Sequence, residues 1–318
     1  DELLEFEVGA VVVATGYDLY SIGQQPDNSP YTGYGEYGYG ADPDIIDSLQ
    51  FERLVSASGP TTGQLKRPSD GRTPKTIAFL QCIGSRCPEK GIEFCSKICC
   101  MYTAKHTMLY KHAVPEGQAV VFYMDVRAGG KRYDEFTRRA VEEDGALYLR
   151  GRVSRLYRED DKLILLGADT LSGEQVQTAV DLVVVAPAVL PQADSRELAQ
   201  KLGVSYDRHG FYVEAHPKLR PVETSTAGIH LAGACQGPMD IPEAVAQGSA
   251  AASKVLGLFA FDELEREPVV ARVNEASCIG CWDCLRACPY DAISEKDINN
   301  RAGAVLRLAE RAFAAGDY

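Results

Sequence analysis

The sequence predicts an α/β protein that contains two related nucleotide-binding-type domains, one inserted in the other, and a small cysteine-rich module. Three observations support this prediction. Similar hydrophobic strands occur at 8–16 and 181–186, where VGAVVVATG and DLVVVA both end in small residues. Between them, apolar strands alternate with amphipathic helical segments, the order that favours a parallel sheet. After a charged linker at 262–268, four closely spaced cysteines occupy 278–288.

The N-terminal part begins with a strand and continues through a loop to a helix. The uninterrupted apolar run at 8–16 is typical of a strand that is buried on both faces. Residues 20–44 are rich in Tyr, Gly, Pro and Asp, which indicates a loop. A helix is predicted from Ser48, its expected N-cap, to about residue 57. Because the chain opens at Asp1 without a methionine, we expect it to be a segment of a longer polypeptide.

The middle of the chain reads as an α/β unit with an antiparallel excursion. Its first strand, TIAFLQ, ends at Cys82, and a helix is expected from Cys95 to about His112. A charged amphipathic helix is expected at 132–143. Further strands are predicted at 119–124, 147–156, 162–166 and 181–185.

A short strand at 228–232 leads into the loop GACQGP and then into a helix of small residues. Pro242 suits the first turn of this helix, which is predicted to end near Leu258. The alanines, glycine and serine on one face of it would let the helix lie close to a sheet or to a flat ligand.

The bulk composition limits the classes of function. A chain of 318 residues should divide into two or three domains, and 45% hydrophobic with 25% charged residues is ordinary for a globular protein. A net charge of −12 argues against a nucleic-acid partner. No apolar run is long enough to span a membrane, and no secretory signal is present. The ten cysteines cluster in metal-type spacings, which predicts a reducing, cytoplasmic location.

The most informative motif is the cysteine run Cys278, Cys281, Cys284 and Cys288, followed by Pro289. Its pattern, C-x2-C-x2-C-x3-C-P, is the spacing with which bacterial-type ferredoxins bind [4Fe–4S] clusters. A zinc site would rather show two separated C-x2-C pairs or histidine partners. The run therefore predicts electron transfer. Two arrangements remain open, because the fourth cysteine of such a run can serve another cluster: Cys288 closes the site itself, or the first three cysteines take a distant fourth ligand.

A second group of cysteines has the pattern C-x12-C-x3-C-C, at Cys82, Cys95, Cys99 and Cys100. A helix would place Cys95 and Cys99 on one side, and Cys82 follows a strand, where ligand-binding loops of α/β folds converge. Two readings stay open on spacing alone: a cluster or metal site, or buried free cysteines. Cys87 in the same loop is interpreted as a bystander.

The turn after the strand at 76–81 lacks a phosphate-binding signature. In a flavoprotein with two dinucleotide sites, this strand should lead into a Gly-rich turn for the pyrophosphate of NAD(P)H. Here the turn reads CIGSR at 82–86, with cysteine in place of glycine. This argues against nicotinamide binding in this domain.

Several sequence blocks are similar to the A subunit of heterodisulfide reductase and its relatives, and this resemblance covers nearly all of the chain to Pro289. The blocks are RPSDG at 67–71, QCIGSR at 81–86, CSKICCMYTAK at 95–105, FYMDVRA at 122–128, HPKLRPVET at 216–224 and AGACQGPMDIPEAVAQ at 232–247.

The resemblance implies a thioredoxin-reductase-like two-dinucleotide-binding fold, in which a Rossmann-like domain is inserted in the FAD domain, plus a small α+β ferredoxin-like module. The FAD fingerprint, G-x-G-x-x-G after a first strand, is absent, and we expect it upstream of Asp1. The domains are predicted as 1–74 (first part of the FAD domain, incomplete), 75–190 (inserted domain with an unusual cluster site), 191–260 (second part of the FAD domain) and 268–318 (ferredoxin-like module).

The resemblance also implies the site residues. It assigns Cys82, Cys95, Cys99 and Cys100 to an unusual [4Fe–4S] site, beside the ferredoxin-type run. The helix that starts near Ile241 would point its positive end at the flavin. Beside Cys235, a redox role and simple packing are both open. The residues expected to contact FAD are Ala14, Thr15, Gly16, Gly233, Ala234, Cys235, Asp240, Ile241, Pro242 and Gln247.

The function that the resemblance implies is that of an oxidoreductase subunit which passes electrons between FAD and [4Fe–4S] clusters, in some members by flavin-based electron bifurcation. The expected partners are other heterodisulfide reductase-type subunits and a hydrogenase or formate dehydrogenase-type electron donor. Three alternatives remain: a quinone-linked subunit of sulfur metabolism, an NAD(P)H-dependent reductase of the glutamate-synthase small-subunit type, and a non-catalytic scaffold with structural clusters.

Overall fold

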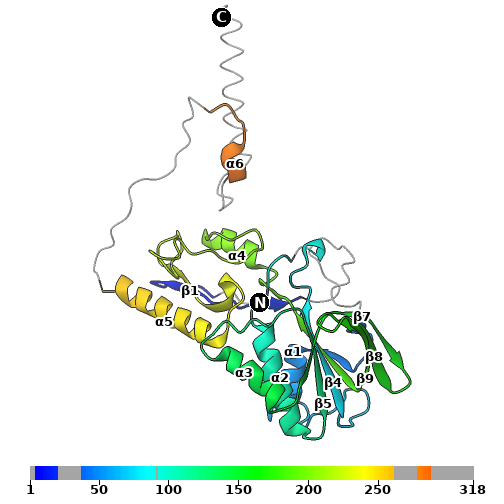
Figure 1. The fold of residues 1–318 in the computed structure, drawn as a ribbon. Coiled ribbons are helices and arrows are strands. Elements are labelled where there is room, and N and C mark those ends of the chain that lie inside the picture. Colours follow the sequence, from blue (N-terminus) through cyan, green and yellow to red (C-terminus); the bar gives the residue numbers. More distant parts are fainter. Residues whose placement is uncertain (1–3, 21–36, 91, 261–277, 288–318) are drawn as a thin grey trace, which may run out of the picture. The chain divides into compact units, whose positions relative to one another are not determined.

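The computed structural model describes residues 4–20, 37–90, 92–260 and 278–287 (Figure 1). The chain divides into two compact units that are discontinuous in sequence. Unit 1 comprises 1–16, 191–237 and 241–318, and unit 2 comprises 17–190 and 238–240.

Unit 2 is built on a five-stranded parallel sheet, which confirms the predicted α/β class. The strands predicted at 76–81, 119–124 and 181–186 are confirmed, each within two residues. In spatial order the sheet contains β3 (Ile45–Asp47), β10 (Leu182–Pro187), β4 (Thr76–Ile83), β5 (Gln118–Tyr123) and β6 (Leu147–Arg150).

The two faces of this sheet are covered differently, and β4 shows how. Ile77 and Phe79 pack on one side with Phe51 and Tyr110, which belong to the helices α1 (Ser48–Val55) and α2 (Cys99–Ala113). Alternate residues such as Leu80 face the other side, where a three-stranded antiparallel sheet covers them. That sheet contains β7 (Val153–Glu159), β8 (Lys162–Asp169) and β9 (Glu174–Val180).

Two predictions for unit 2 need correction, and one strand has no predicted counterpart. The single strand expected at 147–156 is two strands, because the chain turns at Gly151 from the parallel sheet (β6) to the antiparallel one (β7). The polar strand β9 has too little apolar character to be recognised in the sequence. The N-cap of α1 is Asp47 rather than Ser48: the Asp47 carboxylate accepts a hydrogen bond from the Gln50 N–H, and the Gln50 side chain accepts one from the Asp47 N–H.

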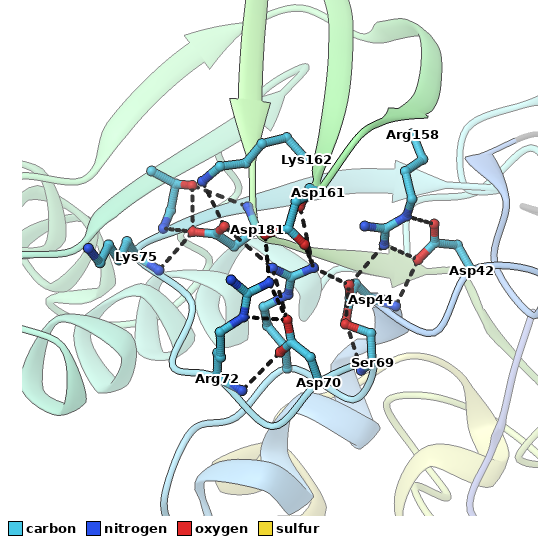
Figure 2. A network of polar contacts seen from close by, with 12 residues as sticks. Asp42, Asp44, Ser69, Asp70, Arg72, Lys75, Arg158, Asp161, Lys162 and Asp181 are labelled. Atoms are coloured by element: carbon cyan, nitrogen blue, oxygen red, sulfur yellow. Dashed lines mark hydrogen bonds and ion pairs between the residues drawn. The ribbon is translucent and has the colours of Figure 1, made fainter.

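A buried ion-pair network fixes the loop at 67–71 to the body of unit 2 (Figure 2). Asp44, which is fully buried, accepts hydrogen bonds at 2.8 Å from both Arg67 and Arg158 and at 2.7 Å from the Ser69 hydroxyl. Nearby, Asp181 binds the backbone N–H of Lys75 and the ammonium of Lys162. The network thus joins the loop, the start of β10 and the hairpin between β7 and β8.

Unit 1 contains a two-stranded parallel sheet of β1 (Val11–Val13) and β12 (Ile229–Leu231). Val13 and Leu231 pack with Ala199 of α4 (Ser195–Leu202) in a small core. The strand expected at 8–16 is shorter than predicted and is not buried on both faces, because the Val12 side chain is 45% exposed. The helix of small residues is present as α5 (Ile241–Leu258).

The two units differ from the predicted domains at 17–74 and at 238–240, which both belong to unit 2. The sequence assigned 1–74 to the FAD domain, whereas residues 17–74 group with unit 2. The physical reason is that β3 forms hydrogen bonds with β10 and that Phe51 of α1 packs on the same sheet. In the part of the chain that the structure describes, none of the helices has the length and apolar character that a membrane crossing requires.

Candidate functional site

The structure brings together three of the four cysteines predicted in unit 2. Cys82 lies near the carboxyl end of β4, and Cys99 and Cys100 are the first two residues of α2. All three are at most 3% exposed. Cys99 interacts with the thiols of both Cys82 and Cys100. The strand end and the helix start therefore form one sulfur-rich site, as the sequence suggested for Cys82.

The surroundings of two of these thiols, Cys82 and Cys100, favour negative charge. A hydrogen bond from Cys99 lowers the pKa of Cys100 to about 7, and the N–H and the positive charge of Arg127 act in the same direction. Hydrogen bonding to Cys99 also lowers the pKa of Cys82, with help from the charge of Arg86. The same two contacts, together with burial, raise the pKa of Cys99, which acts as the donor. A thiolate is the form in which cysteine binds metals.

Cys95 lies differently from the prediction. It belongs to the loop before α2, so the argument that a helix places it beside Cys99 is wrong. The helix cannot begin at Cys95 because Lys97 has a left-handed backbone, with φ of 59°. The Lys97 N–H instead donates to the Cys95 sulfur at 3.3 Å. The pKa of Arg86 is raised, first by its hydrogen bond to Asp125 and also by the charges of Cys82 and Cys95. Cys95 therefore lies close enough to Arg86 to interact with it electrostatically.

Three observations bear on whether this site fits an iron–sulfur cluster. Among the described residues, no group of three or more His, Cys, Asp or Glu side chains is arranged to hold a single metal ion. A [4Fe–4S] cluster, however, binds each thiolate through a different iron, so its ligands need not converge on one ion. The start of α2, where Cys99 and Cys100 lie, has no side-chain cap, so no capping side chain accepts hydrogen bonds from its first N–H groups. The buried Nε2 of Gln81, beside Cys100, has no hydrogen-bond partner. Uncapped and unpaired donors around thiols fit an anionic sulfur cluster.

The turn after β4 is closed to a dinucleotide. Gly84 has φ of 80°, and a Cβ at this position would lie 2.5 Å from the ring of Tyr20. The Tyr20 side chain, only 2% exposed, therefore fills the space above the turn. Only a short 3₁₀ turn (Pro88–Lys90) follows closely, and the next α-helix, α2, begins at Cys99. A pyrophosphate would find neither room nor a helix N-terminus here. Sequence reasoning found the unusual turn but missed Tyr20, Arg86 and Gln81, whose positions depend on tertiary contacts.

The ferredoxin-type run is described only in part. Cys278 is half-buried, while Cys281 and Cys284 are exposed. Cys284 lies in the short helix α6 (Asp283–Ala287), which the Arg286 side chain ties back to the Cys281 carbonyl at 2.7 Å. Cys288 lies outside the described residues.

In unit 1, two loops follow the carboxyl ends of the parallel strands β1 and β12. The residues after β1 are Ala14, Thr15 and Gly16, and those after β12 begin with Gly233. Because the strands are parallel, both loops lie at one edge of the sheet, where α/β folds bind ligands. Gly16 and Gly233 have φ of 76° and 79°, and a Cβ at either would meet no atom within 4 Å. The edge is open and free of side chains at these positions.

Gln247 of α5 holds the second loop in place. Its Oε1 accepts hydrogen bonds from the Gly233 N–H at 2.8 Å and from the Gln236 amide at 2.9 Å. Cys235 is buried in the same loop and donates to the Val13 and Ala232 carbonyls, both at 3.3 Å. Burial raises the pKa of Cys235. This buried, hydrogen-bonded thiol favours the packing interpretation over a redox role.

The remaining residues predicted to contact FAD have mixed surroundings. The Asp240 carboxylate accepts a hydrogen bond from Tyr133 at 2.9 Å within unit 2. At the start of α5, Ile241 is 80% exposed and Pro242 is exposed. Ala234 is half-buried in the 3₁₀ turn Gly233–Gln236.

Comparison with known proteins identifies relatives for nearly the whole chain. The family described as "4Fe-4S binding domain" matches residues 271–294. The iron-sulfur A subunit 2 of the CoB–CoM heterodisulfide reductase from Methanopyrus kandleri is 45% identical over 300 residues, 93% of this chain and 44% of the relative. The A subunit of the H(2):CoB-CoM heterodisulfide,ferredoxin reductase from Methanothermobacter thermautotrophicus is 42% identical over 294 residues, 92% of this chain and 43% of the relative. The chain thus spans less than half the length of these relatives.

Among solved structures, the thioredoxin reductase of T. acidophilum matches with a TM-score of 0.48 and 16% sequence identity. The match covers 79% of this chain and 65% of the other.

Proposed function

Because this chain is a relative of the heterodisulfide reductase A subunit over 93% of its length, we propose that it acts in electron transfer as part of an FAD- and iron–sulfur-dependent oxidoreductase. Electrons pass between FAD, bound by unit 1, and [4Fe–4S] clusters, bound by unit 2 and by the C-terminal module. The observation that carries the proposal is the group of buried thiols at the end of β4, where a nicotinamide domain would bind a pyrophosphate.

The cluster of unit 2 is held by Cys82, Cys95, Cys99 and Cys100. Two features support the ligand role of the buried three: the uncapped helix start, and the positive charge of Arg86 beside Cys82 and Cys100. Both stabilise thiolates, and burial excludes water, which influences the reduction potential. Cys95 completes the set from the loop before α2.

The second cluster is held by the C-terminal run. Its ligands are Cys278, Cys281, Cys284 and Cys288, in the segment that the 4Fe-4S binding family matches. Cys281 and Cys284 are exposed, which suits a centre that exchanges electrons with a partner. Clusters of this kind transfer single electrons.

FAD binds at the open edge of the sheet in unit 1. When bound, it supplies the exchange of paired for single electrons. Gly16 and Gly233 let the backbone approach the cofactor closely, and Gln247 fixes the second loop. The other predicted contacts that lie in unit 1 are Ala14, Thr15, Ala234, Cys235, Ile241 and Pro242.

The complex contains further subunits. The relative from Methanothermobacter thermautotrophicus is named for H2, a heterodisulfide and ferredoxin. By analogy we place a hydrogenase or formate dehydrogenase-type donor and heterodisulfide reductase-type subunits beside this chain. The name of this relative includes two electron acceptors, a heterodisulfide and ferredoxin, which also supports electron bifurcation at the flavin. In the assembled complex, removing either acceptor should then stop reduction of the other. The free cysteines agree with a reducing, cytoplasmic location.

The NAD(P)H-dependent alternative receives no support from the geometry. Tyr20 fills the space above the turn at Gly84, and the next α-helix begins only at Cys99. For the quinone-linked and scaffold alternatives, no specific feature of the described residues speaks in their favour.

Iron and acid-labile sulfide analysis of the full-length protein, prepared without oxygen, tests the proposal. We expect about eight iron atoms per chain from two clusters, and a paramagnetic signal at low temperature after reduction. Fewer than about four would contradict both sites. Zinc in place of iron would also contradict the proposal.

A further inference from the structure

Gln81 is a polar residue in a strand whose interior is otherwise almost entirely apolar. β4 reads TIAFLQCI, and every side chain after Thr76 is buried. Gln81 continues the row of Ile77 and Phe79, which faces the helices, and it is 4% exposed. A carboxamide in such a place requires partners for its hydrogen-bonding atoms, because burying an unpaired polar group is unfavourable.

The partners of Gln81 are incomplete in a specific way. Its Oε1 lies 3.7 Å from the Cys100 sulfur and is one of two acceptors for the weak S–H donor, the other being the Asp125 carbonyl at 3.4 Å. Its Nε2 is buried and has no partner. The Gln81 amide N–H groups, which are strong donors, are therefore unused although the Cys100 thiol is next to the carboxamide.

If Cys100 binds iron, its sulfur changes from a hydrogen-bond donor into an acceptor. A cysteine that binds iron is a thiolate, which has no proton to donate and accepts hydrogen bonds. The Gln81 carbonyl would then face a negative sulfur. Turning the carboxamide over about its last bond exchanges Oε1 and Nε2, which have nearly the same shape, and directs an N–H at the sulfur. The backbone N–H of Arg127 already donates to the same sulfur from another direction.

We propose that Gln81 is a positioning residue of the cluster site, whose carboxamide donates an N–H···S hydrogen bond to the Cys100 thiolate and raises the reduction potential of the cluster. The inference rests on the proposed function, since it requires that Cys100 is a ligand. One-electron reduction adds negative charge to the cluster and its sulfurs without making or breaking a covalent bond. A donor to sulfur therefore stabilises the reduced state more than the oxidised state.

The test compares three variants of the full-length protein. Gln81→Met keeps the approximate volume and removes the donor, and Gln81→Glu places a titratable group there. Leu80→Met is the matched control, because Leu80 is buried in the same strand but faces away from Cys100. The probe is the paramagnetic signal that Cys99→Ser removes, followed during an anaerobic redox titration. Iron and sulfide content are measured in parallel.

We expect Gln81→Met to keep its iron and to shift the reduction equilibrium of this cluster about tenfold toward the oxidised form, which is about 59 mV for one electron. Leu80→Met should titrate like the wild type. In Gln81→Glu the potential should become dependent on pH, because only the protonated carboxyl can donate to sulfur. Packing alone would not produce that dependence.

The possible outcomes separate this inference from the proposed function. Iron in Gln81→Met at the wild-type level with an unchanged potential overturns the inference and leaves the cluster in place. Absence of the Cys99-dependent signal from the wild type overturns the proposed site and the inference with it. If Gln81→Met loses its cluster, Gln81→Glu decides: a potential that does not change with pH overturns the role of Gln81.

Discussion

Replacement of Asp44 by asparagine tests how the buried network holds unit 2 together. The Asp44 carboxylate is fully buried and accepts hydrogen bonds from Arg67, Arg158 and Ser69 at 2.7–3.1 Å. Asparagine keeps the shape but presents an amide to two guanidinium groups. Breaking a buried ion pair costs about 3–5 kcal/mol. We expect about 3 kcal/mol, because Arg67 keeps Asp161, which is 55% exposed and partly screened by water.

The assay is urea unfolding followed by far-ultraviolet circular dichroism, with the stability taken from the midpoint and slope. Asp70→Asn is the matched control, since Asp70 belongs to the same network but pairs mainly with the exposed Arg72. It should be much less destabilising than Asp44→Asn. A loss below about 1 kcal/mol for Asp44→Asn, or equal losses in the two variants, would refute the reasoning.

The same comparison has a defined dependence on pH. Burial by itself would raise the pKa of Asp44, but the hydrogen bonds from Arg67, Ser69 and Arg158 outweigh it and lower the pKa. The stabilisation is therefore complete above the unfolded pKa of about 3.9 and is lost as the pH falls through the lower folded value. The difference in the free energy of unfolding between wild type and Asp44→Asn should be largest at about pH 7 and should shrink below about pH 3.

Three further predictions concern the cofactors. Cys99→Ser should lower the iron content by about four atoms per chain, whereas Cys87→Ser, in the adjacent loop, should leave it unchanged; equal losses would contradict the ligand assignment. Gly233→Ala should weaken FAD binding by about tenfold and destabilise the fold by about 1–2 kcal/mol, as measured by flavin titration and urea unfolding. Gly173→Ala, at a position with φ of 77° and equally open space, should cost similar stability and leave FAD binding unchanged. NADPH should not bleach the flavin; rapid bleaching would restore the NAD(P)H-dependent alternative.

The parts of the fold that could be predicted are those in which local sequence and burial agree. The strands β4, β5 and β10 are continuous apolar runs in the centre of a sheet, so their pattern alone identifies them. β9 was missed, because its alternate residues face water and its apolar content is low. Helix α2 was placed too early, since Lys97 adopts a left-handed conformation that no propensity would predict.

The candidate site shows the same division. The spacing of the cysteines identifies them as candidate cluster ligands, because the type of a ligand and its separation from the next one can be read directly from the sequence. It could not identify Gln81 or Tyr20 as parts of the site, since each acts through a contact with a residue distant in sequence, at Cys100 and Gly84 respectively.

By itself, the sequence determined which residues can bind iron and sulfur, which segments are hydrophobic enough to form the sheet, and that the turn at 82–86 is no phosphate loop. Only the tertiary structure decided that the end of β4 meets the start of α2, which brings Cys82 beside Cys99, and that Cys95 lies outside the helix. The reason is that spacing and hydrophobicity are properties of neighbouring residues, whereas the packing of a strand against a helix depends on every segment folded between them.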